Sequence, residues 1–474
     1  MLQSPVLILS GIVNGYGSSP ISNNIYFFLS FVSLAAGFYM SVSARARVFE
    51  WTSSINSFFN VPIAWAAFGL AVTFVLIAII PDSNTFTFSS LLFEAFSAIT
   101  TTGVTFLDVY SYGYGFVVYM TFLSFFGGIG IVLVFFTFGN AASYLFSGKS
   151  AGGFDSGVGI NGFFVNNLLL KVISVYIGLA LIGFLCYYSL GVRPIDAMIA
   201  AVSSASTSGF LFPLSDKVAV IKVVSIFLMT IASLPLAFLL TINRKSKKIF
   251  NNQITAFFMW ASLFIILAVC IEKPLSESAG VSIVDITFNV VSCISTAGFP
   301  LVGEMRETTL FIITALTVIG GCSGSTTGGL KTSTFSVAFS SLRSDAQSCM
   351  REGSVHYPVY DGQVIDGDHV KYIHSTIFMF LCTYVLFTAC FTYVSNLSVG
   401  DASFWSLSIL TTSGLKFNNF SSILPSDMLK QILFYNFSAF GMLAGRIGLA
   451  YLWFALFKVE NCFRSVGRKV AKIK

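Results

Sequence analysis

Long apolar runs alternate with short polar segments along the whole chain. Several runs are long enough to cross a hydrocarbon core of about 30 Å as a helix, which takes about 20 apolar residues. They cover residues 25–42, 62–81, 114–138, 172–190, 218–240, 255–271, 373–396 and 431–458. No polar block between them is large enough for a separate soluble domain. The pattern therefore predicts an all-α protein that crosses a membrane many times.

The composition supports this location. The 474 residues are 55% hydrophobic and only 10% charged, whereas a soluble domain has about 25% charged residues. Positive charge is concentrated in a few segments outside the apolar runs, namely Arg45 and Arg47, 243–248, Arg343 and Arg351, and 464–474. By the positive-inside rule we expect these segments on the cytoplasmic side. The net charge of +6 thus indicates membrane orientation rather than nucleic-acid binding.

Residue types that usually carry catalysis or bind metals do not form a recognisable site. The eight cysteines lie mostly in apolar runs without a CxxC pair, so we expect buried, reduced thiols. His356, His369 and His374 have no cysteine partners at the spacing of zinc ligands. Since the sequence offers no nucleophile, metal cluster or catalytic carboxylate pair, we expect no enzyme.

Four short segments, 97–105, 203–211, 292–300 and 408–416, share one pattern. Each has a glycine preceded two residues earlier by threonine, and the pairs are Thr101 and Gly103, Thr207 and Gly209, Thr296 and Gly298, and Thr412 and Gly414. Thirteen residues before each glycine stands a residue that favours a helix N-cap, namely Ser90, Asp196, Asp285 and Asp401. About three helical turns fit between them. We expect four short capped helices, each ending in a Thr-x-Gly turn between apolar spans.

Such a repeat can form a site for a desolvated cation. The C-terminal end of a helix has about half a negative charge, and glycine allows backbone angles that turn carbonyl oxygens toward a shared axis. Rings of backbone carbonyls replace the hydration shell of the ion in potassium filters. We expect the filter to consist of Thr101, Thr102, Gly103, Thr207, Ser208, Gly209, Thr296, Ala297, Gly298, Thr412, Ser413 and Gly414. Turns that only pack helices would not need the same spacing in four copies.

The glycine-rich segment 320–334 has some features of a phosphate-binding loop. Leu330 separates Gly329 from Lys331, however, and no strand is expected before the segment, so a P-loop is excluded. Its glycines each disfavour a helix by about 1 kcal/mol, and broken backbone at membrane depth has to face protein or water. We expect this break to face a pore, with the hydroxyls of Ser323, Ser325, Thr326 and Thr327 toward the conduction path. The family resemblance described below implies that the segment is a gate, made of Gly320, Gly321, Gly324, Ser325, Thr326, Thr327, Gly328, Gly329, Lys331 and Arg446.

Two ionisable residues stand inside apolar sequence. Arg446 lies within 431–458, where a charge costs several kcal/mol unless it faces water or a partner. We expect it below the filter as an electrostatic barrier; a structural ion pair or a snorkelling side chain is the alternative. Glu94 lies in the first short helix, where we expect packing or a hydrogen bond to neighbouring backbone rather than ion binding. The sequence "SYGYG" at 111–115 occurs once and predicts an extracellular turn.

The four filter segments, together with "FFGGIGIVL" (125–133), "IGGCSGSTTGGLKT" (319–332) and "GMLAGRIGL" (441–449), resemble the Trk/Ktr/HKT superfamily of potassium transporters. The resemblance is specifically to the bacterial Trk-type translocation subunit and covers about residues 55–460. It implies a single chain that builds one pore, an intramembrane gate loop beneath the filter with the arginine nearby, and a homodimer with one pore in each subunit. Gly448 stands where relatives often have an acid, which leaves an arginine–glutamate pair open.

The expected fold is an all-α polytopic membrane protein with four tandem M1–pore helix–M2 repeats around one central pore. The expected divisions are an extra N-terminal segment at 1–50, repeat 1 at 51–147, repeat 2 at 148–250, repeat 3 at 251–350, and repeat 4 with the basic tail at 351–474. The N-terminal segment lacks a secretory cleavage site. It contains a clear span at 25–42 and a shorter apolar stretch at 4–13, which leaves one or two spans open. The longer start favours a Trk-type over a Ktr-type protein.

The resemblance implies gated, channel-like potassium uptake across a bacterial cytoplasmic membrane, with K⁺ as the transported ion. In plant HKT relatives a serine at the glycine position of the first repeat accompanies sodium transport, so four glycines favour potassium. The fourth segment lacks the Asn-Asn of typical Trk filters, which leaves conduction of Na⁺, or of both ions, open. A cation-coupled symporter would show paired inverted halves instead of four copies in one orientation.

The expected partners follow from the same resemblance. Family members are controlled from the cytoplasmic side by a soluble ring of nucleotide-binding subunits, and we expect such a ring here beside membrane lipid. The chain has no dinucleotide-binding fingerprint, so a nucleotide would act through that ring and not on this chain.

Overall fold

The structure is a computed structural model. It describes residues 3–15, 21–44, 57–80, 87–147, 165–209, 218–236, 252–272, 282–302, 305–350, 356–395, 397–415, 424–425, 427–449 and 453. The basic segments 243–248 and 464–474, together with Arg45 and Arg47, lie outside these residues, as does Cys462.

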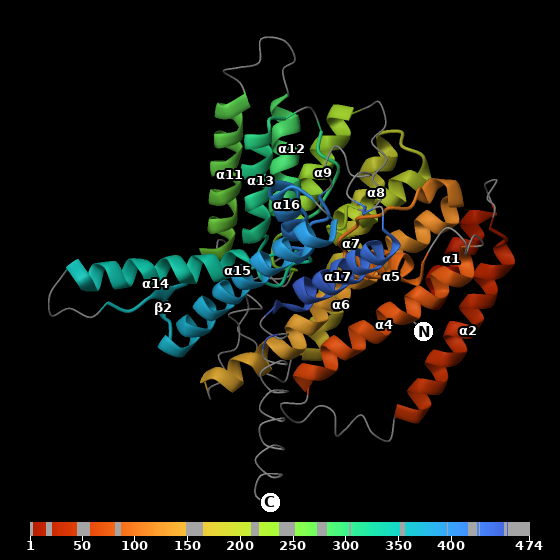
Figure 1. Ribbon diagram of the computed structural model, residues 1–474, viewed down its shortest axis with the longest axis horizontal. Coiled ribbons are helices and arrows are strands. Elements are labelled where there is room, and N and C mark those ends of the chain that lie inside the picture. The colour runs from red at the N-terminus through yellow and green to blue at the C-terminus, as the bar shows by residue number, and fades with distance from the viewer. Residues whose placement is uncertain are drawn as a thin grey trace, which may run out of the picture.

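Two helices precede the repeats, α1 (Gln3–Asn14) and α2 (Asn23–Ala44), and they pack against each other (Figure 1). The hydroxyl oxygens of Ser4 and Ser30 lie 2.9 Å apart across this contact. Both apolar stretches near the N-terminus are therefore helical. With 12 residues, α1 is shorter than the about 20 residues that a full membrane crossing takes.

After this pair, the order of a long helix, a short helix and a second flanking helix recurs four times. The first copy has α4 (Ser57–Ile79), α5 (Phe88–Ile99), the short 3-10 helix η1 (Val109–Tyr112) and α6 (Tyr114–Ser147). The second has α7 (Val165–Ser189), α8 (Pro194–Ser206) and α9 (Val218–Ala232). The third has α11 (Asn252–Glu272), α12 (Ile283–Ile294) and two successive helices, α13 (Glu307–Ile319) and α14 (Thr332–Met350). The fourth has α15 (Gly367–Ser395), α16 (Val399–Leu410) and α17 (Met428–Ile447).

A small hairpin joins the third copy to the fourth. Its strands are β1 (Val359–Tyr360) and β2 (Gln363–Val364), which pair antiparallel with Val359 opposite Val364. Tyr360 packs with Val337 of α14 and Ile373 of α15. The hairpin therefore fixes where the two helices meet (Figure 1).

The short helices α5, α8, α12 and α16 form the centre of the fold, because nearly all of their side chains beyond the first turn are buried. Trp405 of α16 is one of the largest fully buried side chains. Its ring stacks on Phe434 of α17, with centroids 5.5 Å apart, and on Phe93 of α5, at 6.4 Å. Aromatic packing of this kind joins the first copy to the fourth and closes the arrangement.

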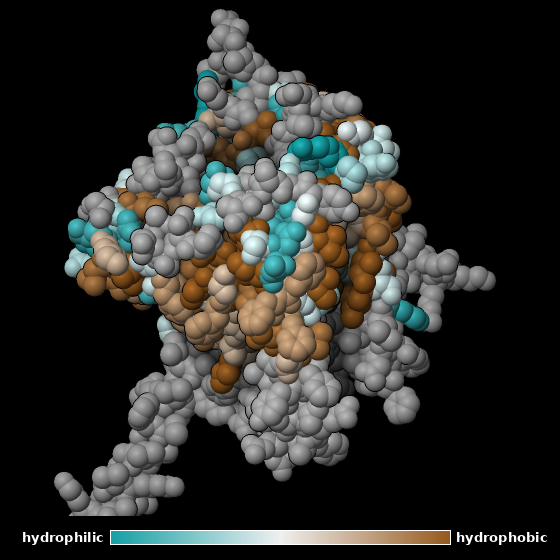
Figure 2. All heavy atoms as spheres, turned by 90° about the vertical axis from the view of Figure 1, so that its right-hand side faces the viewer, coloured by the Kyte–Doolittle hydropathy of each residue, from teal (hydrophilic) through white to brown (hydrophobic). Residues whose placement is uncertain are grey.

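The outer helices expose apolar side chains instead of polar ones. Among the described residues, four helical segments are long and apolar enough to cross a membrane: Pro62–Ile79, Lys171–Ser189, Gln253–Glu272 and Gly367–Ser395. Phe31 of α2, Phe74 of α4 and Ile266 of α11 are 72%, 62% and 61% exposed. Figure 2 shows a broad hydrophobic area on one such face. A surface of this kind matches contact with lipid and confirms the multi-pass membrane fold.

The expected N-caps are wrong by three residues. The residues that precede the four short helices are Thr87, Arg193, Ser282 and Ser398, whereas Ser90, Asp196, Asp285 and Asp401 lie inside the first turns. Ser398 Oγ accepts from the amide of Asp401 at 3.1 Å and donates to its carboxylate at 2.7 Å. Asp401 is thus a partner of the cap Ser398 and lies at the positive helix end, without being the cap itself.

Two further expectations are corrected by the structure. The seven described cysteines are free, but Cys270, Cys349 and Cys382 are exposed and not buried. Cys270 and Cys382 lie in apolar runs, which here face lipid as well as core, whereas Cys349 lies near the end of the polar helix α14. The last apolar run also does not form one helix. α17 ends at Ile447, and Gly448 follows with φ of 105°, a left-handed value that favours glycine.

Candidate cation pathway

The four Thr-x-Gly turns have the same unusual backbone. Thr101, Thr207, Thr296 and Thr412 have φ of 57°, 51°, 50° and 50°, and Gly103, Gly209, Gly298 and Gly414 have φ of 75°, 56°, 66° and 68°. Positive φ is rare for a β-branched residue, and such strain costs about 1–3 kcal/mol per residue. Strain repeated in four copies persists only where the surrounding structure imposes it, and it concentrates at functional sites.

The amide after each threonine points back to its own short helix. Thr102, Ser208, Ala297 and Ser413 donate to the backbone oxygens of Ser97, Ser203, Ser292 and Ser408 at 2.9–3.1 Å. By contrast, no backbone or side-chain donor among the described residues bonds to the carbonyl oxygens of 101–103, 207–209, 296–298 and 412–414. Buried carbonyls normally have partners. These four sets of oxygens are therefore available to a cation or its water.

Three close backbone contacts connect the four turns to one another. A methyl group placed on Gly209 would lie 2.1 Å from the carbonyl oxygen of Ala297. One on Gly298 would lie 1.7 Å from that of Ser413, and one on Gly414 would lie 1.7 Å from that of Thr102. The second turn thus touches the third, the third touches the fourth and the fourth touches the first. The structure brings the twelve expected filter residues together, and only glycine fits at these contacts.

A serine six residues before each glycine fixes the outgoing chain, and sequence reasoning missed it. Ser97 Oγ donates to the carbonyl of Val104 at 2.5 Å, and Ser408 Oγ donates to that of Leu415 at 3.0 Å. Ser292 Oγ accepts from the amide of Phe299 at 3.0 Å, while Ser203 Oγ lies 3.4 Å from Ser208 Oγ. The signal was present, because all four segments begin with this serine.

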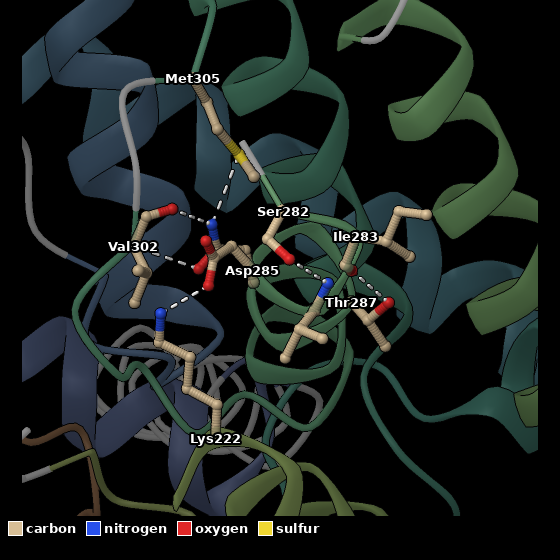
Figure 3. A network of polar contacts seen from close by, with 9 residues as sticks. Lys222, Ser282, Ile283, Asp285, Thr287, Val302 and Met305 are labelled. Carbon is tan, nitrogen blue, oxygen red and sulfur yellow. Dashed lines mark hydrogen bonds and ion pairs between the residues drawn. The ribbon is translucent and has the colours of Figure 1, made fainter. Parts of the chain in front are cut away.

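Two longer polar side chains brace the segments after the turns. Glu94 of α5 accepts a hydrogen bond from the amide of Phe106 at 2.8 Å, which confirms the expected bond to neighbouring backbone. Asn289 of α12, at the matching position, accepts from the amide of Val302 at 3.0 Å and donates to its carbonyl at 2.9 Å (Figure 3).

Figure 3 also shows an ion pair between Lys222 and Asp285 that links two copies. Lys222 Nζ of α9, in the second copy, lies 2.5 Å from Asp285 Oδ1 of α12, in the third. Both side chains are largely buried, at 7% and 18% exposure. The pair therefore fixes the first turn of α12 against its neighbour.

The glycine-rich segment breaks the helix as expected. α13 ends at Ile319, α14 begins at Thr332, and Gly320, Gly324, Gly329 and Lys331 between them have positive φ. Gly328 donates its amide to Thr296 Oγ1 at 2.7 Å, and Thr326 Oγ1 donates to the carbonyl of Ala205 at 3.3 Å. A methyl group on Gly328 would lie 2.0 Å from the carbonyl oxygen of Thr411. The loop therefore lies against the C-terminal ends of three of the four short helices.

The helix of the second copy is also broken, and the broken segment lies against the glycine-rich loop. α9 ends at Ala232, and the carbonyl oxygen of Ser233 accepts a hydrogen bond from the amide of Cys322 at 3.0 Å. Leu236 donates its amide to the carbonyl of Gly324 at 3.1 Å. The backbone groups that the two breaks release thus satisfy each other, as a membrane interior requires.

Arg446 lies in the last turn of α17 and is 3% exposed. Its Nε and Nη2 atoms have no hydrogen-bond partner, and no ion pair to it is found, among the described residues. Together with Lys331 of the loop it lines a cavity of about 110 Å³. The structural ion pair that the sequence left open is therefore not seen within the described part of the chain.

No protein-family model matches the chain. The Trk system potassium uptake protein TrkI of Halomonas elongata is 25% identical over 378 residues, which are 74% of this chain and 75% of TrkI. TrkG of Escherichia coli, also a Trk system potassium uptake protein, is 22% identical over 72% of each chain. An uncharacterized cation transporter of Methanocaldococcus jannaschii is 28% identical over 54% of this chain and 53% of its own length.

The solved structures give a longer match. The crystal structure of the potassium transporter TrkH from Vibrio parahaemolyticus superposes with a TM-score of 0.78 at 18% identity and covers 96% of both chains. This shows that the all-helical membrane fold is shared over nearly the whole length. The resemblance inferred from the sequence is confirmed as a similarity: the chain is similar in sequence to two Trk system potassium uptake proteins, and it shares the fold of TrkH.

Proposed function

We propose that this chain is a potassium uptake subunit that conducts K⁺ through a gated, channel-like pathway across a bacterial cytoplasmic membrane. The names of TrkI and TrkG and the TrkH fold support potassium as the transported ion. The principal structural support is the ring of four turns that share one strained backbone and expose carbonyl oxygens without protein donors. Such oxygens can replace the water around an alkali-metal ion.

In this proposal the threonine, middle residue and glycine of each turn form the selectivity filter. Close backbone contact between turns sets the size of the ring, because Gly298 and Gly414 leave no room for a methyl group beside the next carbonyl. A ring whose size is fixed in this way can distinguish K⁺ from the smaller Na⁺. Conduction of Na⁺, or of both ions, is the alternative that the test below separates.

The loop 320–331 is the proposed gate and Arg446 a barrier beside it. The loop contacts the ends of α8, α12 and α16, so a displacement of the loop would change the space below the filter. We further propose that the chain works as a homodimer in lipid and is controlled by a cytoplasmic nucleotide-binding ring. The name "Trk system" of its relatives and the cytoplasmic expectation for the basic segments support this assembly.

Uptake of rubidium, a potassium substitute, into liposomes that contain the purified protein tests the proposal. We expect saturable rubidium uptake that external K⁺ inhibits strongly and Na⁺ inhibits weakly. We also expect the protein to restore growth of a potassium-uptake-deficient bacterium at low K⁺. Equal inhibition by Na⁺ would favour the mixed pathway, whereas uptake no faster than in empty liposomes would refute conduction by this chain.

A further inference from the structure

We propose that the cavity between the glycine-rich loop, α15 and α17 is a binding site for a small inorganic anion. Its main ligand is Arg446, with Lys331 as the second positive group. The site is separate from the filter, and its ligand is opposite in charge to the transported ion.

The first observation is a buried charge that is not compensated. Arg446 is 97% removed from solvent, yet two of its guanidinium nitrogens, Nε and Nη2, find no acceptor among the described residues. A buried guanidinium is normally paired and hydrogen-bonded, because its desolvation is otherwise uncompensated. Arginine also presents its N–H groups in a planar fork that suits a single anion.

The second observation is the chemistry of the cavity wall. Lys331 is 8% exposed and donates from Nζ to the backbone oxygen and, at 3.1 Å, to Oγ1 of Thr327. Hydroxyls of Thr327, Thr334 and Thr376 are also present in the lining, and none of the described lining residues is an aspartate or glutamate. A lining with two cationic side chains and no carboxylate favours an anion and disfavours a cation.

Size limits the ligand further. The cavity measures about 110 Å³, whereas about 10–15 Å³ on the same measure is enough for one water molecule. It therefore has room for a halide with a few waters, or for one phosphate ion. Gluconate is a much larger organic anion and therefore serves as the reference anion.

The position of the site suggests what the anion does. Lys331 belongs to the loop, whereas Arg446 belongs to α17, so an anion between them connects the loop to the last helix of the fourth repeat. This inference rests on the proposed function of the loop as a gate. An anion that connects the loop to α17 would stabilise the position of the loop below the filter.

The test measures thermal unfolding of the delipidated, detergent-purified full chain at one fixed K⁺ concentration. Gluconate is replaced stepwise by chloride, bromide or inorganic phosphate. Binding to the folded state raises the unfolding temperature in a saturable manner. We expect such a rise with at least one of the three anions, an at least tenfold weaker apparent affinity in Arg446→Gln, and a weaker one in Lys331→Gln. The control Lys371→Gln removes an exposed cation of α15 and should leave the affinity unchanged.

A structure determined from bromide-containing crystals gives an independent readout. An anomalous peak within hydrogen-bonding distance of the Arg446 guanidinium supports the proposal even if Arg446→Gln does not fold. Equal stability of the unaltered protein in all four anions, an affinity that Lys331→Gln leaves unchanged, or a lipid phosphate in the cavity instead of a free ion would overturn it. Rubidium uptake by the same preparation keeps the two proposals apart: uptake without anion binding refutes only the anion site, and anion binding without uptake refutes only conduction.

Discussion

Replacement of Gly298 by alanine perturbs the proposed filter at one defined point. The added methyl group would lie 1.7 Å from the carbonyl oxygen of Ser413, whereas ordinary contact begins at about 3.4 Å. Both groups belong to backbone in a ring that also contacts the next turn, so neither can rotate away. The third and fourth turns must therefore separate.

The expected cost comes from two sources. An alanine at the φ of 66° observed for Gly298 costs about 1–2 kcal/mol, and forcing an extra carbon into a packed interior costs about 1–3 kcal/mol. Together they destabilise the native ring by about 2–5 kcal/mol. Since about 1.4 kcal/mol corresponds to a tenfold change in Kd, each 1.4 kcal/mol of this cost that falls on the ion-bound conformation weakens ion affinity about tenfold.

Rubidium uptake into liposomes measures this effect, with Na⁺ competition as a measure of selectivity. We expect Gly298→Ala to reduce uptake at least about tenfold and to weaken the preference for K⁺ over Na⁺. Gly178→Ala is the matched control, because a methyl group there has no atom within 4 Å and the position lies within α7. If Gly298→Ala protein that folds and inserts normally retains uptake and selectivity, the close ring of turns is not the filter.

Three further changes test other parts of the structure. Ser292→Ala removes the acceptor of the Phe299 amide and should cost about 1–3 kcal/mol of stability while weakening K⁺ preference; unchanged unfolding and selectivity would exclude a supporting role. Lys222→Ala leaves Asp285 without its buried partner and should lower the free energy of unfolding by about 3 kcal/mol, measured by denaturant titration, with recovery in the double variant Lys222→Met/Asp285→Leu. A failure to recover would mean that the loss comes from packing. Arg446→Ala removes the proposed barrier and should raise rubidium uptake, and uptake at or below that of the unaltered protein would contradict this role for the arginine.

Much of this fold follows from the sequence because one spacing occurs four times. Apolar length predicted the spans, and the Thr-x-Gly register predicted four short helices that end at turns of the same conformation. Consecutive glycines predicted the break after Ile319, because a membrane interior has no water to compensate for lost helical bonds.

Other features could not be predicted from the same pattern. Asp285 and Asp401 favour a helix start as strongly as a serine does, and only the backbone shows that Ser282 and Ser398 are the caps. The exposed Cys270 shows that apolar sequence does not separate lipid contact from core. The Lys222–Asp285 pair joins two repeats, so no spacing within one repeat reveals it.

The most direct test of the filter is a structure of the protein in rubidium or thallium salts, with the ion located by its anomalous scattering. The account predicts at least one ion on the axis between the four turns, coordinated by carbonyl oxygens from each of the segments 101–103, 207–209, 296–298 and 412–414. Saturating ion with no density between the turns, or ions bound only outside the ring, would contradict it.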